Sequence, residues 1–169
     1  ITLEIVDPDS GARVLGRGEQ GEVRARGAQL MTGYRNLPEQ TAETLRGGWL
    51  YTGDIGELDE DGYLFIRDRK KDMAIVGGYN VYPREIDEVL YSHPEVAEVG
   101  AVGVPDAYRG EIVKAYVVPR PGCSPGEEAL LAHCRANLAG YKVPARIEFV
   151  SALPRTQVGK LDRKALRAL

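Results

Sequence analysis

One lysine near the end of the chain stands in a setting that suits chemistry on a charged ligand. In the segment LPRTQVGKLDRKAL, residues 153–166, Lys160 follows Gly159 directly and precedes a short basic stretch. An ammonium on a flexible stem is a mobile point charge that can engage a phosphate and withdraw again. A surface lysine that serves only solubility would look much the same, so the segment by itself leaves both interpretations open.

A carboxylate earlier in the chain is a second candidate. In YTGD, Asp54 follows a glycine at the end of an expected strand. A carboxylate there can accept two hydrogen bonds from the diol of a sugar. An aspartate that only stabilises a turn is the better explanation of these four residues taken alone.

Two segments between these residues carry clustered cations and paired glycines. RDRKKDM, residues 67–73, crowds four basic side chains, among them Arg69, beside two aspartates. Most such charge runs form a solvated face. IVGGYNVYPREI, residues 75–86, contains Gly77 and Gly78, which suit a tight turn or a close approach of the backbone to a ligand. A plain hairpin is the simpler alternative there.

The first part of the chain has the apolar pattern of a β-rich structure. Strands are expected at 2–7 and 21–27 and twice within 48–69, and a short helix at 36–45. An acidic turn at 59–62 joins the last two of these strands, and its Gly62 can take a positive φ.

After Lys71 the pattern changes to a mixture of helices and strands. Helices are expected at 84–93, 125–141 and 162–169, and strands at 96–105, 111–119 and 145–150. Gly140 is expected to end the second of these helices. The sequence therefore predicts the α+β class, with a β-rich piece at 1–71 and a compact α+β piece at 72–169 that has a short antiparallel sheet flanked by helices.

Composition excludes several classes of protein. The 169 residues carry a net charge of −3, whereas a dedicated nucleic-acid binder usually has a basic excess. Two cysteines and two histidines form no recognisable metal spacing. No apolar run is long enough to cross a bilayer. We expect a cytoplasmic protein, with peripheral attachment to a membrane left open. Because the opening segment ITLEIVD reads as if the chain starts within a strand, we also expect the chain to be part of a longer protein.

Taken together and in order, these segments resemble the AMP-forming acyl-CoA synthetases, the adenylate-forming family that includes fatty-acid CoA ligases and luciferases. The segment NVYPREI is more similar to fatty-acid CoA ligases than to the adenylation domains of peptide synthetases. The matching stretches cover nearly the whole chain: MTGYRNLPEQT, GWLYTGDIGELDEDGYL, DRKKDM, GGYNVYPREID and LPRTQVGKLDRKAL.

The resemblance implies a two-step reaction. A carboxylate, here a fatty acid, attacks the α-phosphate of ATP to give acyl-AMP and pyrophosphate, and the thiol of CoA then displaces AMP. It also implies Mg²⁺, with ligands mainly outside this chain. In such enzymes a large N-terminal domain holds the substrates and a small C-terminal domain rotates between the steps. By this resemblance 1–71 is the last β-rich subdomain of the large domain, and 72–169 is the mobile lid.

Site residues follow from the same resemblance. In the first piece it implies that Asp54 binds the ribose hydroxyls of ATP or AMP, that Arg69 helps to hold the ribose or phosphate, and that Lys71 is the hinge.

In the second piece the resemblance implies two further sites. Gly77, Gly78 and Tyr79 line the pantetheine tunnel for CoA. Lys160 is the catalytic lysine, which reaches the phosphate and the carboxylate during adenylation. Stabilising the charge that builds up on the α-phosphate is a role that an ammonium suits.

Two substitutions depart from the family pattern. Asp68 stands where many members have glycine, and Asp87 replaces the commoner glutamate after REI. The phosphate-binding loop, the adenine pocket and the acyl tunnel of the family are expected upstream of Ile1, so we expect the 169 residues alone to be inactive.

Two alternatives remain open from the sequence. One is a non-catalytic binding or regulatory module that shares the lid fold. The other is an adenylation domain that serves a carrier protein.

Overall fold

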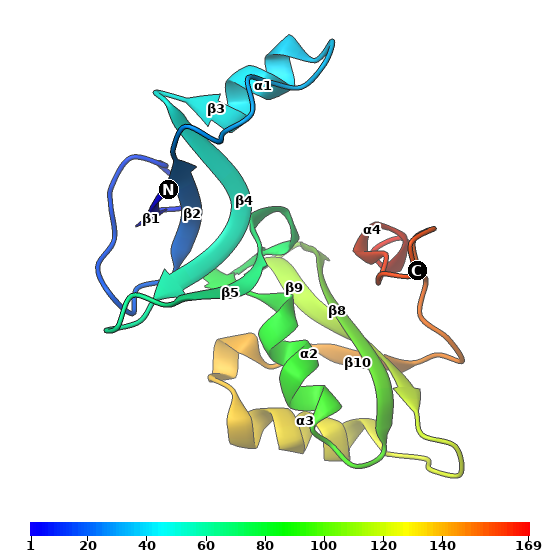
Figure 1. The fold of residues 1–169 in the computed structure, drawn as a ribbon. Helices are drawn as coiled ribbons and strands as arrows, with labels where there is room; N and C mark the ends of the chain where they lie inside the picture. Colours follow the sequence, from blue (N-terminus) through cyan, green and yellow to red (C-terminus); the bar gives the residue numbers. More distant parts are fainter. The chain divides into compact units, whose positions relative to one another are not determined.

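The computed structural model describes all 169 residues, and the chain divides into two compact units, Ile1–Lys71 and Asp72–Leu169 (Figure 1). Each unit has its own five-stranded sheet. The α+β class predicted from the sequence is confirmed.

The first unit is an antiparallel sheet with one short helix. In order along the chain its elements are β1 (Thr2–Val6), β2 (Gly21–Arg26), α1 (Pro38–Thr44), β3 (Leu45–Arg46), β4 (Trp49–Leu58) and β5 (Leu64–Arg69). The strands are ordered β1-β2-β4-β3, and β5 also pairs with β4. The long strand β4 therefore holds β2, β3 and β5 together.

The core of the first unit is small and aliphatic. Its buried apolar side chains are Ile5 and Val6 on β1, Val23 and Ala25 on β2, and Ile55 on β4. Burial of this surface stabilises the unit because apolar area leaves water.

The turn between β4 and β5 has the predicted conformation. Gly62 has a φ of +87°, and the side chain of Asp59 accepts a hydrogen bond from the amide of Tyr63 at 2.8 Å. A residue without a Cβ adopts that φ at little cost.

The second unit has a mixed sheet with helices against it. A 3₁₀ turn, η1 (Lys70–Asp72), precedes it. Its elements are β6 (Ala74–Val76), β7 (Tyr79–Val81), α2 (Pro83–Tyr91), β8 (Val96–Asp106), β9 (Gly110–Pro119), α3 (Glu127–Asn137), η2 (Gly140–Lys142), β10 (Arg146–Phe149) and α4 (Arg163–Leu166). The strands are ordered β10-β9-β6-β7, and β8 also pairs with β9.

Alternate residues of β8 and β9 face the two sides of this sheet. Ala101, Ala115 and Val117 pack in one buried cluster with residues of α2 and α3, which lie next to each other in Figure 1. Val102 and Tyr116 pack in another cluster with Leu153 and with Leu166 of α4. The period of two along a strand produces this division. The segment that carries Lys160 is therefore anchored at both ends on the second face.

Two details differ from the sequence-based expectations. Strand β10 runs parallel to β9, so the sheet is mixed rather than antiparallel. Helix α3 ends at Asn137, and Gly140 begins η2 instead of ending the helix. Leu138 takes an extended conformation and packs against the core, which stops the helix two residues before the glycine.

Candidate functional site

Asp54 and Arg69 lie opposite each other on neighbouring strands of the first unit. They are Cα partners in the pairing of β4 with β5, and Asp54 Oδ1 forms an ion pair with a guanidinium nitrogen of Arg69. The Asp54 side chain is 29% exposed and that of Arg69 is 53% exposed. The pair is thus built into the sheet and still accessible to a ligand.

A bulge in β4 turns Asp54 toward Arg69. Glu22 pairs with Ile55 and Arg24 with Tyr51, so residues 52–54 of β4 oppose a single residue of β2. Gly53 has a φ of +70°, which favours glycine at this position. Such bulges re-aim a side chain beside a site.

Side chains next to the bulge fix its shape. The hydroxyl of Thr52 donates to the carbonyl of Val23 at 2.8 Å and accepts from the amide of Asp54 at 3.1 Å. On β5, the buried carboxylate of Asp68 accepts from the amide of Arg69 at 2.7 Å. Asp68, which departs from the family pattern, therefore helps to order the backbone of Arg69.

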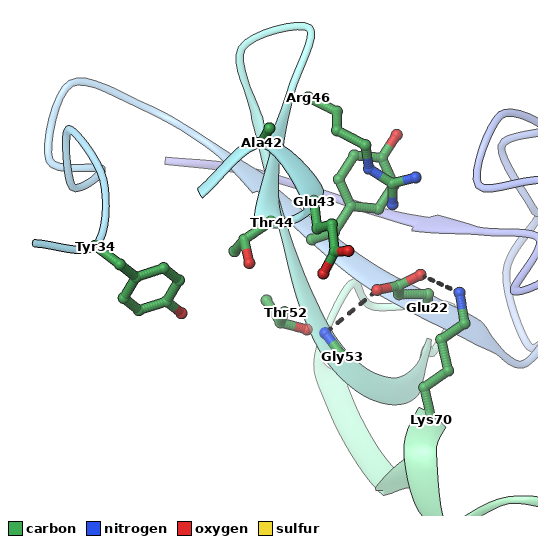
Figure 2. A pocket seen from close by; sticks show the side chains of 10 residues that line it. Glu22, Tyr34, Ala42, Glu43, Thr44, Arg46, Thr52, Gly53 and Lys70 are labelled. Carbon is green, nitrogen blue, oxygen red and sulfur yellow. Dashed lines mark hydrogen bonds and ion pairs between the residues drawn. The ribbon is translucent and has the colours of Figure 1, made fainter. Parts of the chain in front are cut away.

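A polar surface pocket of about 600 Å³ lies beside this bulge (Figure 2). Gly53 and Lys70, the chain neighbours of Asp54 and Arg69, form part of its wall. Its other lining side chains include hydroxyls and carboxylates: Glu22, Tyr34, Glu43, Thr44 and Thr52. The surroundings of the Asp54–Arg69 pair thus suit a ligand with several hydrogen-bonding groups.

Lys71 is the last residue of the first unit and lies in η1. It is exposed and belongs to neither sheet. The position predicted as a hinge is therefore the position where the chain passes from one compact unit to the other.

In the second unit Gly77 and Gly78 form the turn of the β6–β7 hairpin. Both have positive φ, +57° and +86°, as a two-residue hairpin turn of this type requires. The amide of Gly77 donates to the carbonyl of Arg109 at 3.0 Å. The hairpin that was the simpler alternative is present, and its tip is tied to the β8–β9 turn.

An open pocket of about 580 Å³ adjoins this hairpin. Tyr79 is exposed and stacks on Tyr141 of η2, with ring centroids 4.6 Å apart. Arg109 and the exposed Tyr108 complete the rim. The sequence-based predictions missed Tyr141 and Arg109. The only sequence signal for them is an aromatic or basic residue directly beside a glycine.

Lys160 stands at the end of a tight turn. The amide of Thr156 donates to the carbonyl of Lys160 at 2.8 Å, and the amide of Gly159 donates to the carbonyl of Thr156 at 2.9 Å. Gly159 has a φ of +78°. The Lys160 ammonium is exposed and forms no hydrogen bond or ion pair within the chain.

Arg155 braces this turn. One guanidinium nitrogen of Arg155 donates to the carbonyl of Gly159 at 3.0 Å, and another donates to Glu98 on β8 at 2.6 Å. Nothing in the sequence pattern indicated this role, because Glu98 and Arg155 are 57 residues apart.

Asp87 anchors the helix that follows the turn. Its carboxylate accepts from Arg163 of α4 and from the amide of Ala101 on β8, both at 2.6 Å. The departure from glutamate at this position is thus accommodated by a partly buried ion pair that fixes the chain just beyond Lys160.

The structure groups the predicted residues within units. Asp54 and Arg69 come together in the first unit, whereas Gly77, Gly78, Tyr79 and Lys160 belong to the second. No group of three or more His, Cys, Asp or Glu residues is placed to hold a metal ion. No helix is both long and apolar enough to span a bilayer.

Comparison with known proteins agrees with this geometry. Residues 85–160 match the family of the AMP-binding enzyme C-terminal domain. The chain carries the C-terminal domain of the AMP-binding enzymes. The chain is 53% identical to a long-chain-fatty-acid–CoA ligase of Bacillus subtilis over 148 residues. These residues make up 88% of the chain and 26% of that protein. The resemblance to AMP-forming acyl-CoA synthetases is confirmed.

Solved structures extend the similarity over both units. The ATP-bound MatB of Rhodopseudomonas palustris matches 99% of the chain and 33% of its own, with a TM-score of 0.92 and 38% identity. The apo form of MatB covers the same share with a TM-score of 0.73. The amide bond synthetase McbA of Marinactinospora thermotolerans is 47% identical over 99% of the chain and 34% of its own, with a TM-score of 0.90. The chain spans about a quarter to a third of the length of these relatives.

Proposed function

We propose that this chain is the C-terminal part of an ATP-dependent, AMP-forming acyl-CoA synthetase that acts on fatty acids. In the first step a carboxylate oxygen attacks the α-phosphorus, the bond to pyrophosphate breaks, and acyl-AMP forms. In the second step the sulfur of CoA attacks the acyl carbon, the bond to AMP breaks, and the thioester forms. The similarity to fatty-acid CoA ligases supports the choice of carboxylate.

One contrast in the structure carries this proposal. Asp54 and Arg69 form an ordered pair on a rigid sheet, while the Lys160 ammonium is exposed and without a partner in the chain. Asp54 accepts hydrogen bonds from the ribose diol, and Arg69 stabilises its orientation and the phosphate charge. Lys160 stabilises the negative charge that develops on the α-phosphate as pyrophosphate leaves.

The β6–β7 hairpin serves the second step. Gly77 and Gly78 lack side chains, so pantetheine can approach their backbone closely. Tyr79 lies beside the pocket that Tyr141 and Arg109 line, which supports contact with an aromatic and anionic thiol carrier such as CoA.

Rotation of the second unit about Lys71 would bring different elements to the reacting atoms in the two steps. The ATP-bound and apo structures of MatB match this chain with different TM-scores, 0.92 and 0.73, which supports such a change in the family. A chain segment outside both sheets, as at Lys71, absorbs such a rotation with least loss of contacts.

A second acyl acceptor has specific support. McbA, which is named an amide bond synthetase, is 47% identical to this chain. An amine that attacks the acyl carbon of acyl-AMP in place of CoA would form an amide and release AMP. The identity of the acyl acceptor must therefore be tested separately from the formation of acyl-AMP.

The full-length protein tests both points. We expect pyrophosphate release with ATP and fatty acids, and acyl-CoA as the product when CoA is added. Formation of amides but no thioester would show that the acceptor is an amine. No pyrophosphate release with any carboxylate would favour a regulatory module and contradict the proposal. The isolated 169 residues are expected to be inactive in the same assay.

A further inference from the structure

Glu22 is a buried carboxylate that the proposed reaction does not use. It lies on β2, and only 3% of its surface is exposed. A buried charge is costly unless it is paired and hydrogen-bonded, so its partners explain why it is tolerated.

Both carboxylate oxygens of Glu22 have hydrogen-bond partners, and each partner is a chain neighbour of Asp54 or Arg69. Oε1 accepts from the amide of Gly53 at 3.3 Å, and Oε2 accepts from the ammonium of Lys70 at 2.9 Å (Figure 2). Gly53 precedes Asp54 in the bulge of β4, and Lys70 follows Arg69 at the end of β5.

These contacts surround Asp54 and Arg69, the two residues proposed to bind the nucleotide. Glu22 holds the backbone just before Asp54 and the side chain just after Arg69, and the Asp54–Arg69 ion pair joins the two strands on the other side. The bulge takes residues 52–54 out of the regular ladder between β2 and β4. Side-chain contacts, including that of Glu22, therefore set the orientation of Asp54.

Other ion pairs in the same sheet lack this arrangement. Glu57 of β4 pairs with Arg67 of β5, which lies at the register shift between these two strands, and Glu4 of β1 pairs with Arg24 of β2. Neither carboxylate bonds to a residue adjacent to Asp54 or Arg69. A role in general sheet stability would be shared by all three pairs, whereas only Glu22 contacts Gly53 and Lys70, the chain neighbours of Asp54 and Arg69.

We propose that Glu22 is a positioning residue for nucleotide binding, which fixes Asp54 and Arg69 through Gly53 and Lys70. The inference rests on the proposed function, because it assumes that Asp54 and Arg69 bind ATP and AMP. Glu22 itself does not touch the nucleotide. Its loss should weaken the binding of ATP and AMP without changing the binding of the carboxylate.

The test compares Glu22→Gln with Glu57→Gln in the full-length protein. Glutamine at position 22 keeps an oxygen for the Gly53 amide but loses the charge that holds Lys70. Displacing binding groups by a fraction of an ångström costs about tenfold to a hundredfold. We expect Glu22→Gln to raise the KM for ATP and the Kd for AMP by about tenfold, with the KM for the carboxylate unchanged. Glu57→Gln should leave all three near the wild-type values.

Two variants at position 70 separate positioning from folding. Lys70→Gln leaves the Glu22–Gly53 hydrogen bond in place and should raise the Kd for AMP as Glu22→Gln does. Lys70→Arg keeps a cation opposite Glu22 and should restore AMP binding to near the wild-type value. If Glu22→Gln does not yield folded protein, these two variants carry the test.

Equilibrium binding of AMP keeps the outcomes distinct. If the wild type forms acyl-AMP but the variants at positions 22 and 70 bind AMP as tightly as Glu57→Gln, the positioning role is wrong and the proposed function stands. An equal rise in the KM for ATP and for the carboxylate would also overturn it, because it would indicate a general structural defect. A wild-type protein that does not bind AMP would overturn both proposals.

Discussion

The two units present their candidate functional groups in opposite ways. In the first unit Asp54 and Arg69 are paired with each other, and the strands that carry them are fixed by Thr52, Glu22 and Asp68. In the second unit only the backbone around Lys160 is fixed, and its ammonium has no partner in the chain.

This difference fits the chemistry of the two proposed half-reactions. The ribose is present in both ATP and acyl-AMP, so the groups that hold it can stay in one place throughout. Charge on the leaving pyrophosphate and the α-phosphate develops only in the first step, so a cation that serves it can be free to leave afterwards. An exposed lysine on a braced turn meets that requirement.

The largest effect is expected from Lys160→Ala. Loss of one preorganised charge contact in a transition state costs about 3 to 4 kcal/mol, or roughly a hundredfold to a thousandfold in rate. That loss should appear in acyl-AMP formation, measured by pyrophosphate release. With acyl-AMP and CoA supplied, thioester formation should stay near the wild-type rate. Lys164→Ala, which removes a nearby exposed lysine, is the matched control, and an equal fall in both half-reactions would contradict the role.

Asp54→Ala should impair both half-reactions, whereas Lys160→Ala should impair only acyl-AMP formation. Removing a charged hydrogen-bonding partner costs about 2 kcal/mol, or roughly thirtyfold. Because the ribose is held in both steps, the KM for ATP and the KM for acyl-AMP should rise together. Separate kinetics of the two half-reactions measure this. A change confined to one half-reaction would place Asp54 outside the ribose site.

A smaller effect is expected from Arg155→Gln. This variant breaks the brace between Glu98 and the carbonyl of Gly159, so the Lys160 turn becomes less ordered. The rate of acyl-AMP formation should fall by about tenfold while thioester formation is unaffected. Glu98→Gln should lower the rate of acyl-AMP formation by a smaller factor, because Arg155 keeps its hydrogen bond to the carbonyl of Gly159. Unchanged adenylation in Arg155→Gln would show that the turn is ordered without the brace.

The sequence was sufficient for the elements that depend on local pattern and turn chemistry. Alternation in 48–69 and the glycine at position 62 predicted β4, β5 and the turn between them. The direction of β10 and the end of α3 at Asn137 were predicted wrongly, because both depend on packing against β9 and the core.

The candidate site divides in the same way. Asp54, Arg69 and Lys160 stand in recognisable short segments, so resemblance could indicate them. Glu22 and Arg155 could not be found in this manner, because their partners are distant in sequence. Glu22 reaches Lys70 across 48 residues, and no periodicity connects the two.

The smallest effect is expected on the reactivity of a buried thiol, which reports whether Lys160→Ala disturbs the core. Burial raises the pKa of Cys134 on α3 to about 11, so its thiol stays neutral and unreactive at pH 8. Cys123, which is only partly buried, should react with iodoacetamide first. In Lys160→Ala, Cys134 should stay as protected as in the wild type, as measured by mass spectrometry. Rapid labelling of Cys134 would mean that the substitution opens the core.

The same shift has a defined consequence for stability. The folded protein binds the Cys134 proton more tightly than the unfolded chain does. Stability from this group is therefore present below the ordinary thiol pKa and is lost as pH rises from about 9 to about 11. Cys134→Ala should reduce the pH dependence of thermal unfolding within that window, although it also leaves a small cavity. An unchanged slope would show that the thiol is not the titrating group.

The most direct test of the account asks whether Lys160 reaches the α-phosphate of a nucleotide held by Asp54. A mixed anhydride of a carboxylic acid with AMP transfers its acyl group to a nearby amine: the amine attacks the acyl carbon, an amide forms and AMP leaves. In the full-length protein at low reagent concentration, mass spectrometry should find the acyl group on Lys160 in preference to Lys164. Asp54→Ala should lower the labelling of Lys160. Equal labelling of both lysines, unaffected by Asp54→Ala, would contradict the account.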